Sequence, residues 1–255
     1  SQKRDMSVSL SDYTLGAAGQ GWYVDEMLNE NPQLNGSKLE SKQWSLAGGK
    51  ELKTAVPGNL ISLAAYPEVN GKLVDAKKVD LKSAVQNSEL KWTAPSGDWK
   101  VIAISQNTVK TSFDPMNPLS GTKTIEKFYQ RFEDRNPGEA GKGLNFFFSD
   151  ELQFGIRGFL WNDKFSSEFK KRKGYDIIPE LPNLFADFGL KSYKIRLDYN
   201  DVMVSLSEEN FFKPDPAVNT FEFVLGKHSE DEPFDFEAKP VEEIYDRRLS
   251  DAEAE

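Results

Sequence analysis

The sequence predicts an α/β fold into which a smaller all-β module is inserted, and three observations support this prediction. The apolar, phenylalanine-rich run at 144–148 is typical of a strand that is buried on both faces. An acidic loop and then a helical pattern follow it, which together form one strand-loop-helix unit. Between 35 and 110, by contrast, short β-like runs alternate with turn signals.

We therefore expect residues 1–34 and 111–213 to form parts of an α/β domain and 35–110 to form an inserted, sandwich-like module. The segment 214–255 is expected to be an acidic, disordered tail. It holds 13 of the 41 acidic and 4 of the 32 basic residues, so it carries the whole net charge of −9. Neither part offers a basic surface for phosphates, and nucleic acid is not an expected partner.

The composition excludes several kinds of site. The chain of 255 residues has no cysteine, which rules out disulfides, thiolate metal ligands and cysteine nucleophiles. No stretch approaches the roughly 20 apolar residues that span a bilayer, so membrane insertion is not expected. The first residues show no basic and then apolar export signal, although such a signal could have been removed.

The N-terminal part begins with a predicted strand at 6–10, and Asp12 lies just past its end. Three glycines follow between 16 and 21. Their order is not that of a dinucleotide-binding loop, and no Gly-Lys-Ser/Thr follows, so a phosphate site is disfavoured. We interpret this stretch as a flexible turn that carries Trp22.

The β-rich region contains five candidate strands, at 43–46, 60–65, 72–74, 89–93 and 99–106. The turn signals between them are Gly48-Gly49, Pro57-Gly58, Asn70-Gly71 and Pro95-Ser96-Gly97-Asp98. The last strand is expected to be apolar on both faces near its middle. No catalytic constellation lies in this region, so we assign it packing or sugar contact.

Four helical runs are predicted in the remaining chain. The first is 120–135, which Ser120 or Thr122 would cap and Pro137-Gly138 would end. The second passes through Trp161, Phe165 and Phe169 and stops at Gly174. The third is 178–188, which Gly189 would stop, and the fourth is 194–210. The last has Ile195, Tyr199, Val202 and Leu206 as its apolar stripe.

Asp150 and Glu151 are the strongest candidates for catalysis, because they follow the predicted buried strand directly. A strand fixes the position of such acids, and apolar surroundings can raise a carboxyl pKa. One acid could protonate a leaving group while another carboxylate activates water or attacks. The alternative is that Asp150 caps the next turn and Glu151 is merely exposed.

Substrate contacts are predicted at three further residues. Asp12 is the one candidate for a second strand-end carboxylate that faces Glu151. Trp22 and Trp161 could stack on a sugar ring, but a tryptophan with Phe four residues later, as at Trp161, is more often a core residue.

Other polar residues favour structural roles. Asp198 is expected to pair with Lys194 one helical turn earlier, and Asp201 to lie on the same solvated helix face. His228 is the sole histidine and lies in the acidic tail, which disfavours a Ser-His-Asp relay and excludes a histidine-rich metal site.

Several segments together resemble bacterial glycoside hydrolases related to the α-L-rhamnosidase family 106. They are LSDYTLGAAGQGW, KWTAPSGDWKVIA, FFFSDELQFG, FLWND, EFKKRKGYDIIPELPNLF and KIRLDYNDVMVSLSEENFFKP. The resemblance covers residues 6–214, and its most specific part is Gly174-Tyr175-Asp176.

The resemblance implies a (β/α)8-type catalytic barrel with a β-rich insertion and hydrolysis of glycosidic bonds, with Glu151 and Asp150 at a strand's C-terminal end. It also implies a carbohydrate substrate, a secreted or periplasmic location and a calcium ion as the one cofactor to consider. The chain then looks like the front part of a larger barrel enzyme, whose remainder would be its partner. The alternative is a non-catalytic carbohydrate-binding or interaction protein, which would lack the second strand-end carboxylate.

Overall fold

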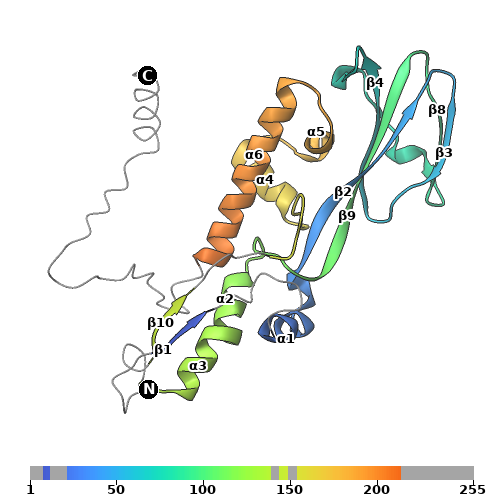
Figure 1. Cartoon of the computed structure of the whole chain (residues 1–255). Coiled ribbons are helices and arrows are strands. Elements are labelled where there is room, and N and C mark those ends of the chain that lie inside the picture. Colours follow the sequence, from blue (N-terminus) through green and yellow to red (C-terminus); the bar gives the residue numbers. More distant parts are fainter. Residues whose placement is uncertain (1–7, 12–21, 139–143, 149–153, 214–255) are drawn as a thin grey trace, which may run out of the picture. The chain divides into compact units, whose positions relative to one another are not determined.

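The computed structural model describes residues 8–11, 22–138, 144–148 and 154–213 (Figure 1). All of them belong to one compact unit, which spans residues 1–219. A second unit, 220–255, lies outside the described residues, as does the whole acidic tail expected at 214–255. The described chain mixes helices and strands, as the sequence predicts.

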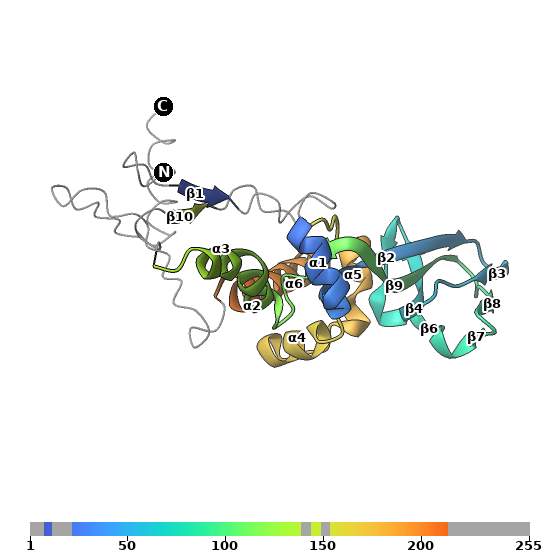
Figure 2. The ribbon, with the colours of Figure 1, turned by 90° about the horizontal axis from the view of Figure 1, so that it is seen from below.

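Antiparallel strands fill the region between residues 35 and 113. They are β2 (Asn35–Leu46), β3 (Glu51–Ala55), β4 (Leu60–Val69), β5 (Lys72–Leu73), β6 (Val79–Asp80), β7 (Val85–Gln86), β8 (Glu89–Thr93) and β9 (Asp98–Phe113). One sheet has the order β2-β9-β4-β5, with β6 paired to β4, and a second has the order β3-β8-β7. Figure 2 shows β2, β9 and β4 side by side. All five predicted strands are present; β3, β6 and β7 were not predicted.

The middle of strand β9, from Val101 to Ile104, is buried on both of its faces, as predicted from its apolar residues. Val101 and Ala103 pack into a core between the two sheets, together with Leu63 and Leu90. Ile102 and the other residues of the opposite face pack against helices instead. One strand therefore serves two cores, which requires consecutive apolar residues rather than an alternating pattern.

The turn between β4 and β5 shows how local sequence sets the strand register. Asn70 and Gly71 have positive φ angles of 52° and 74°, and Val69 pairs with Lys72 across them. Two consecutive residues with positive φ form the tight turn that matches strand twist. The predicted Asn70-Gly71 turn is therefore confirmed.

Helices make up most of the remaining described chain. They are α1 (Trp22–Glu30), α2 (Ser120–Thr124), α3 (Gln130–Arg135), α4 (Phe165–Lys173), α5 (Pro182–Phe185) and α6 (Leu190–Ser207). The 3₁₀ turns are η3 (Pro32–Leu34), η4 (Asp75–Lys77), η5 (Lys82–Ala84) and η7 (Ile178–Glu180); η6 (Ile125–Tyr129) and η8 (Glu208–Phe212) are π-helical.

The predicted helix 120–135 is present as the continuous run α2, η6 and α3. Its predicted cap is wrong, since the N-cap is Leu119, and no side chain caps it. The Ser120 hydroxyl instead donates to the carbonyl oxygen of Asp114 at 2.5 Å. The hydroxyl therefore donates to the preceding loop instead of accepting from an amide of the helix's first turn.

The helix expected to include Trp161 begins four residues later, at Phe165. Trp161 lies in an extended stretch, where Leu160 bridges Lys38 of β2. The end of α4 is as predicted, since Gly174 is its C-cap with φ of 79°. Pairing with β2 outweighed the helical spacing of the aromatic residues.

The single helix predicted over 178–188 is wrong. The chain forms η7 and then α5, and each of them has a proline in its first turn. Proline lacks the amide that a continuing helix needs, so each one starts a new short turn. Gly189, predicted as a stop, is instead the N-cap residue of α6.

Two clusters of apolar residues join the helices to the strands. In the larger one, α4, α5 and α6 contribute Phe165, Leu184 and Tyr199, which pack with Leu39 and Ile102 of the five-stranded sheet. The predicted stripe of α6, from Ile195 to Leu206, is buried there. The smaller cluster joins α1 and η6 to the end of β9 and to Phe211.

The remaining strands, β1 (Val8–Ser11) and β10 (Leu144–Phe148), pair with each other in parallel (Figure 2). Both were predicted as strands. Within the described ranges this is the one parallel pair, and an eight-stranded barrel stays a prediction. The division into a barrel-like domain and an inserted module likewise stays a prediction.

Candidate functional site

The strands that precede the predicted acids end at the same edge of their sheet. The register of β1 and β10 places their last residues, Ser11 and Phe148, opposite each other. Asp12 follows one strand directly, while Asp150 and Glu151 follow the other after one serine. The three acids themselves lie outside the described residues. In parallel α/β folds, catalytic groups gather at the edge where the strands' carboxyl ends meet.

The chain that follows these acids is attached to the five-stranded sheet. Three backbone hydrogen bonds hold it: Phe113 N to Phe154 O at 3.1 Å, Leu39 N to Phe159 O at 2.8 Å, and Trp161 N to Ser37 O at 2.9 Å. Phe113 of β9 and Leu39 of β2 donate to this segment, and Trp161 of the segment donates to β2. In the chain, Asp150 and Glu151 therefore lie between strand β10 and the hydrogen bond of Phe154 to β9.

A glycine permits the close approach of this attached segment. A Cβ atom built on Gly36, in β2, would lie 2.2 Å from Ile156 Cδ1 and 2.7 Å from Ser112 Oγ. Such distances are far below van der Waals contact, so a side chain at this position would displace its neighbours. The absence of a side chain at Gly36 is thus what lets Ile156 pack against β2.

Asp114 is a buried carboxylate that the sequence did not single out. Its residue is 3% exposed, and its carboxylate accepts hydrogen bonds from the Met116 amide at 2.9 Å and from Asn162 Nδ2 at 2.8 Å. Burial raises the pKa of Asp114, although these two hydrogen bonds partly offset that effect. Asp114 therefore ties the end of β9 to the segment after the predicted acids. The Asp-Pro pair after a strand is a turn signal that could have indicated it.

The two tryptophans predicted to bind sugar have different positions. Trp161 is 4% exposed, and its ring centroid lies 5.0 Å from that of Phe165 inside the larger cluster. Nearby, the Tyr199 hydroxyl donates to the carbonyl oxygen of Leu160 at 2.5 Å. The ring of Trp161 is thus part of the core. Trp22 is the first residue of α1, and its side chain lies outside the described residues.

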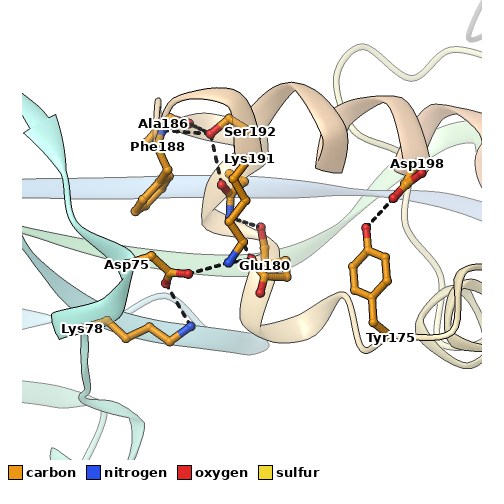
Figure 3. Close-up of polar contacts among 10 residues, drawn as sticks. Asp75, Lys78, Tyr175, Glu180, Ala186, Phe188, Lys191, Ser192 and Asp198 are labelled. Carbon is orange, nitrogen blue, oxygen red and sulfur yellow. Dashed lines mark hydrogen bonds and ion pairs between the residues drawn. The ribbon is translucent and has the colours of Figure 1, made fainter.

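The Gly174-Tyr175-Asp176 segment has a clear structural role. Gly174 ends α4, and the Asp176 carboxylate accepts a hydrogen bond from the Ile178 amide at 2.9 Å, which starts η7. The Tyr175 hydroxyl donates to Asp198 on α6 at 2.7 Å (Figure 3). The segment therefore links the end of α4 to both η7 and α6.

The predicted pairing of Asp198 with Lys194 is confirmed. Burial acts to raise the Asp198 pKa, but hydrogen bonds from Lys194 and Tyr175 outweigh it, so the pKa is lowered. Asp201 on the same helix pairs with Lys173 from α4. Asp201 is largely exposed, as the sequence indicated, whereas the side chain of Asp198 is only 18% exposed.

A second polar cluster was not predicted at all. Lys191 Nζ lies 2.5 Å from Asp75 Oδ2 and 2.7 Å from Glu180 Oε2 (Figure 3). Lys78 completes the cluster at 3.1 Å from Asp75. Asp75 and Lys78 are three residues apart, but no spacing in the sequence relates them to Glu180 and Lys191.

The acidic side chains in the part of the chain that the structure describes do not gather into a metal site. Within it, no group of three or more His, Cys, Asp or Glu side chains could hold a metal ion. The calcium ion that the family resemblance allows stays a prediction. In the same residues, no helix combines the length and the apolar character needed to cross a membrane.

Comparison with known proteins identifies a family and a similar fold. A family model described as α-L-rhamnosidase, glycoside hydrolase 106, matches residues 59–214. No curated protein matches the chain. Among solved structures, a rhamnosidase from Novosphingobium sp. PP1Y superposes with a TM-score of 0.52 at 12% identity. The match covers 85% of this chain but 38% of that enzyme, and at such an identity it shows the fold alone. On the family match, the chain belongs to the glycoside hydrolase 106 family of α-L-rhamnosidases.

Proposed function

We propose that the chain takes part in the hydrolysis of α-L-rhamnosyl bonds in an oligosaccharide or polysaccharide. The observation that carries this proposal is the parallel pairing of β1 with β10, which ends at Ser11 and Phe148. The acids that directly follow these ends in the sequence are of the type that glycosidic hydrolysis requires. Membership of a rhamnosidase family supplies the substrate class.

In the proposed mechanism, Glu151 acts as the general acid or base and Asp150 assists it. One carboxylic acid protonates the glycosidic oxygen as the bond to the sugar breaks. A second carboxylate, for which Asp12 is the candidate, either activates water or attacks the sugar carbon. A carboxylate separation of about 5 Å would predict retention of configuration, and about 6.5–9.5 Å would predict inversion.

Sugar contact is assigned to Trp22 rather than to Trp161. Trp161 is enclosed by aromatic residues of the core, so its ring faces cannot stack on a sugar without local unfolding. Trp22 lies at the start of α1, shortly after Asp12 in the sequence. Its position after the same strand end favours it as the stacking residue.

The architecture proposed for the working enzyme is a (β/α)8-type barrel, of which this chain supplies a part. The chain spans 38% of the rhamnosidase structure it resembles. The parallel pair of β1 and β10 has two outer edges that further parallel strands could extend. The segments that complete such a barrel would be the partner of this chain.

The test is the release of 4-nitrophenol from its α-L-rhamnoside by the whole chain and by the Glu151→Gln variant. Removing a general acid or base should lower the rate by about 10²–10⁴-fold. Asp163→Asn is a matched control, because Asp163 is exposed in the loop before α4. Circular dichroism should be the same for all three proteins. Turnover by the unaltered chain that persists in Glu151→Gln would contradict the assignment.

A further inference from the structure

Helix α6 exposes a row of apolar side chains on the face opposite its buried stripe. We call this row the α6 stripe; it consists of Leu190, Tyr193, Leu197 and Val204, which are 87%, 61%, 70% and 57% exposed. Its members lie within one narrow arc of the helix, given 100° per residue. Single exposed apolar residues are common, but an aligned row on one helix indicates a contact surface.

Three residues of the α6 stripe have the spacing of one of the two positions that form a seam between helices. Leu190, Leu197 and Val204 recur every seven residues, and Tyr193 lies three residues after the first. A seven-residue repeat of this kind keeps one narrow face turned toward a partner helix along its length. The occupant that fits the stripe is therefore another α-helix.

Two charged residues beside the stripe define the orientation of that helix. Lys194 and Asp201 flank it on one side, also seven residues apart, and both are largely exposed. When two α6 helices pair antiparallel about Leu197, Leu190 meets Val204 of the other copy. In the same arrangement, the positions of Lys194 and of the other copy's Asp201 along the helix axis differ by about one residue, or about 1.5 Å. In parallel pairing, Lys194 would instead lie level with Lys194 of the other copy, and Asp201 with Asp201.

We propose that two copies of this chain associate through the α6 stripe, antiparallel, with a two-fold axis at Leu197. Such an interface is isologous, since the same patch serves both copies. A single pair of helices buries less than the roughly 1,200 Å² of standard interfaces, so the association is weak and reversible. The ion pairs Lys194–Asp198 and Lys173–Asp201 remain at the edge of this interface. There, Lys194 and Asp201 of the second copy lie beside them.

Single cysteine variants test this directly, because the chain has no cysteine of its own. Under mild oxidation, Leu197→Cys should form disulfide-linked dimers on the order of tenfold faster than Val69→Cys, since association raises the local thiol concentration. Val69 is a matched control, being 54% exposed on β4. Val204→Cys alone should link slowly, because 14 residues, or about 21 Å, separate the two copies of that position along the axis. A mixture of Leu190→Cys and Val204→Cys should give mixed dimers.

Three outcomes would overturn the proposal. Equal rates for Leu197→Cys and Val69→Cys would mean that the stripe stays free or is covered by another part of the same chain. Fast linking of each variant to itself would mean parallel pairing. In the Leu197→Cys background, Lys194→Glu should slow disulfide formation, because it places like charges opposite each other. Adding Asp201→Lys should restore the rate. If it does not, the antiparallel register is contradicted. Circular dichroism verifies folding of each variant.

Discussion

Lys191 Nζ, in the first turn of α6, lies 2.5 Å from Asp75 Oδ2, although 116 residues separate the two in the chain. Asp75 begins η4 between β5 and β6, so this ion pair connects the β-rich region to the helices. Glu180 in η7 accepts from the same ammonium group. One cation therefore joins three segments that no local pattern relates.

Replacing this cation should destabilise the fold. Lys191→Met keeps the length of the side chain but leaves two half-buried carboxylates without their common partner. Because Lys191 is more than a third exposed, water and salt screen the pair, and we expect a loss of about 1 kcal/mol in the free energy of unfolding. Urea denaturation at neutral pH measures it. Lys170→Met, at an exposed site on α4, is the control and should change stability by less than about 0.5 kcal/mol.

The cost of Lys191→Met should depend on pH. Burial acts to raise the Asp75 pKa, but hydrogen bonds from Lys191 and Lys78 outweigh it, so the pKa lies below its usual 3.8. A carboxylate whose folded pKa is lowered stabilises the protein above its unfolded pKa, and this contribution is lost as the pH falls through the folded pKa. The difference between wild type and variant should thus shrink on acidification below pH 3.8. A difference that stays constant with pH would rule out the ion pair as its cause.

Asp114→Ala should cost more, because it leaves hydrogen-bond donors without an acceptor. The Met116 amide is buried and the Asn162 amide group is half-buried, and both donate to this carboxylate. The expected loss is about 2–3 kcal/mol in urea denaturation. Asp163→Ala, one residue after Asn162 but exposed, is the control. Equal losses in both variants would contradict a role for the Asp114 hydrogen bonds.

The direction of the Asp114 pKa shift predicts how the stability lost in Asp114→Ala changes with pH. Burial raises the pKa, so the folded state binds this proton more tightly than the unfolded state. The stability that results is present below the unfolded pKa and is lost as the pH rises through the folded pKa. Wild type should therefore exceed Asp114→Ala by more in mild acid than at neutral pH, as measured by urea denaturation across that range.

Gly36→Ala should destabilise the contact between β2 and the segment after the predicted acids. The new methyl group would overlap Ile156 Cδ1, and overpacking of this kind costs about 1–3 kcal/mol. The double variant with Ile156→Ala should recover part of that loss, which a double-mutant cycle reports as a coupling energy. Gly58→Ala is the matched control, since a Cβ there meets nothing within 4 Å. Purely additive effects would contradict the contact.

Trp161→Ala should lower stability by about 3–5 kcal/mol, as expected for an enclosed aromatic residue. Trp161→Phe should cost less because much of the ring contact with Phe165 is retained. Thermal unfolding compares the two variants with wild type. Unchanged stability together with weakened saccharide binding would instead support the sugar-stacking role predicted from the sequence.

Local patterns predicted those elements whose residues interact with near neighbours in the chain. The Asn70-Gly71 turn and the Gly174 stop follow from backbone angles that few residues adopt. The buried stripe of α6 follows from its period, and the two-faced burial of β9 follows from its run of apolar residues. The strand preceding Asp150 and Glu151 was predicted for the same reason.

The sequence by itself determined five of the strands between 35 and 113, the Asn70-Gly71 turn, the buried stripe of α6 and the place of the predicted acids after a strand end. The tertiary structure alone decided that Trp161 is extended and enclosed, that Asp114 is a buried acceptor, and that Lys191 meets Asp75. Each of these depends on which segments, far apart in sequence, become neighbours in space. Hydrogen bonding to β2 outweighed a weak helical preference at Trp161, because propensity contributes only tenths of a kcal/mol per residue, or about 0.7 at most for ordinary residues. Long-range contacts leave no periodic pattern in a single sequence.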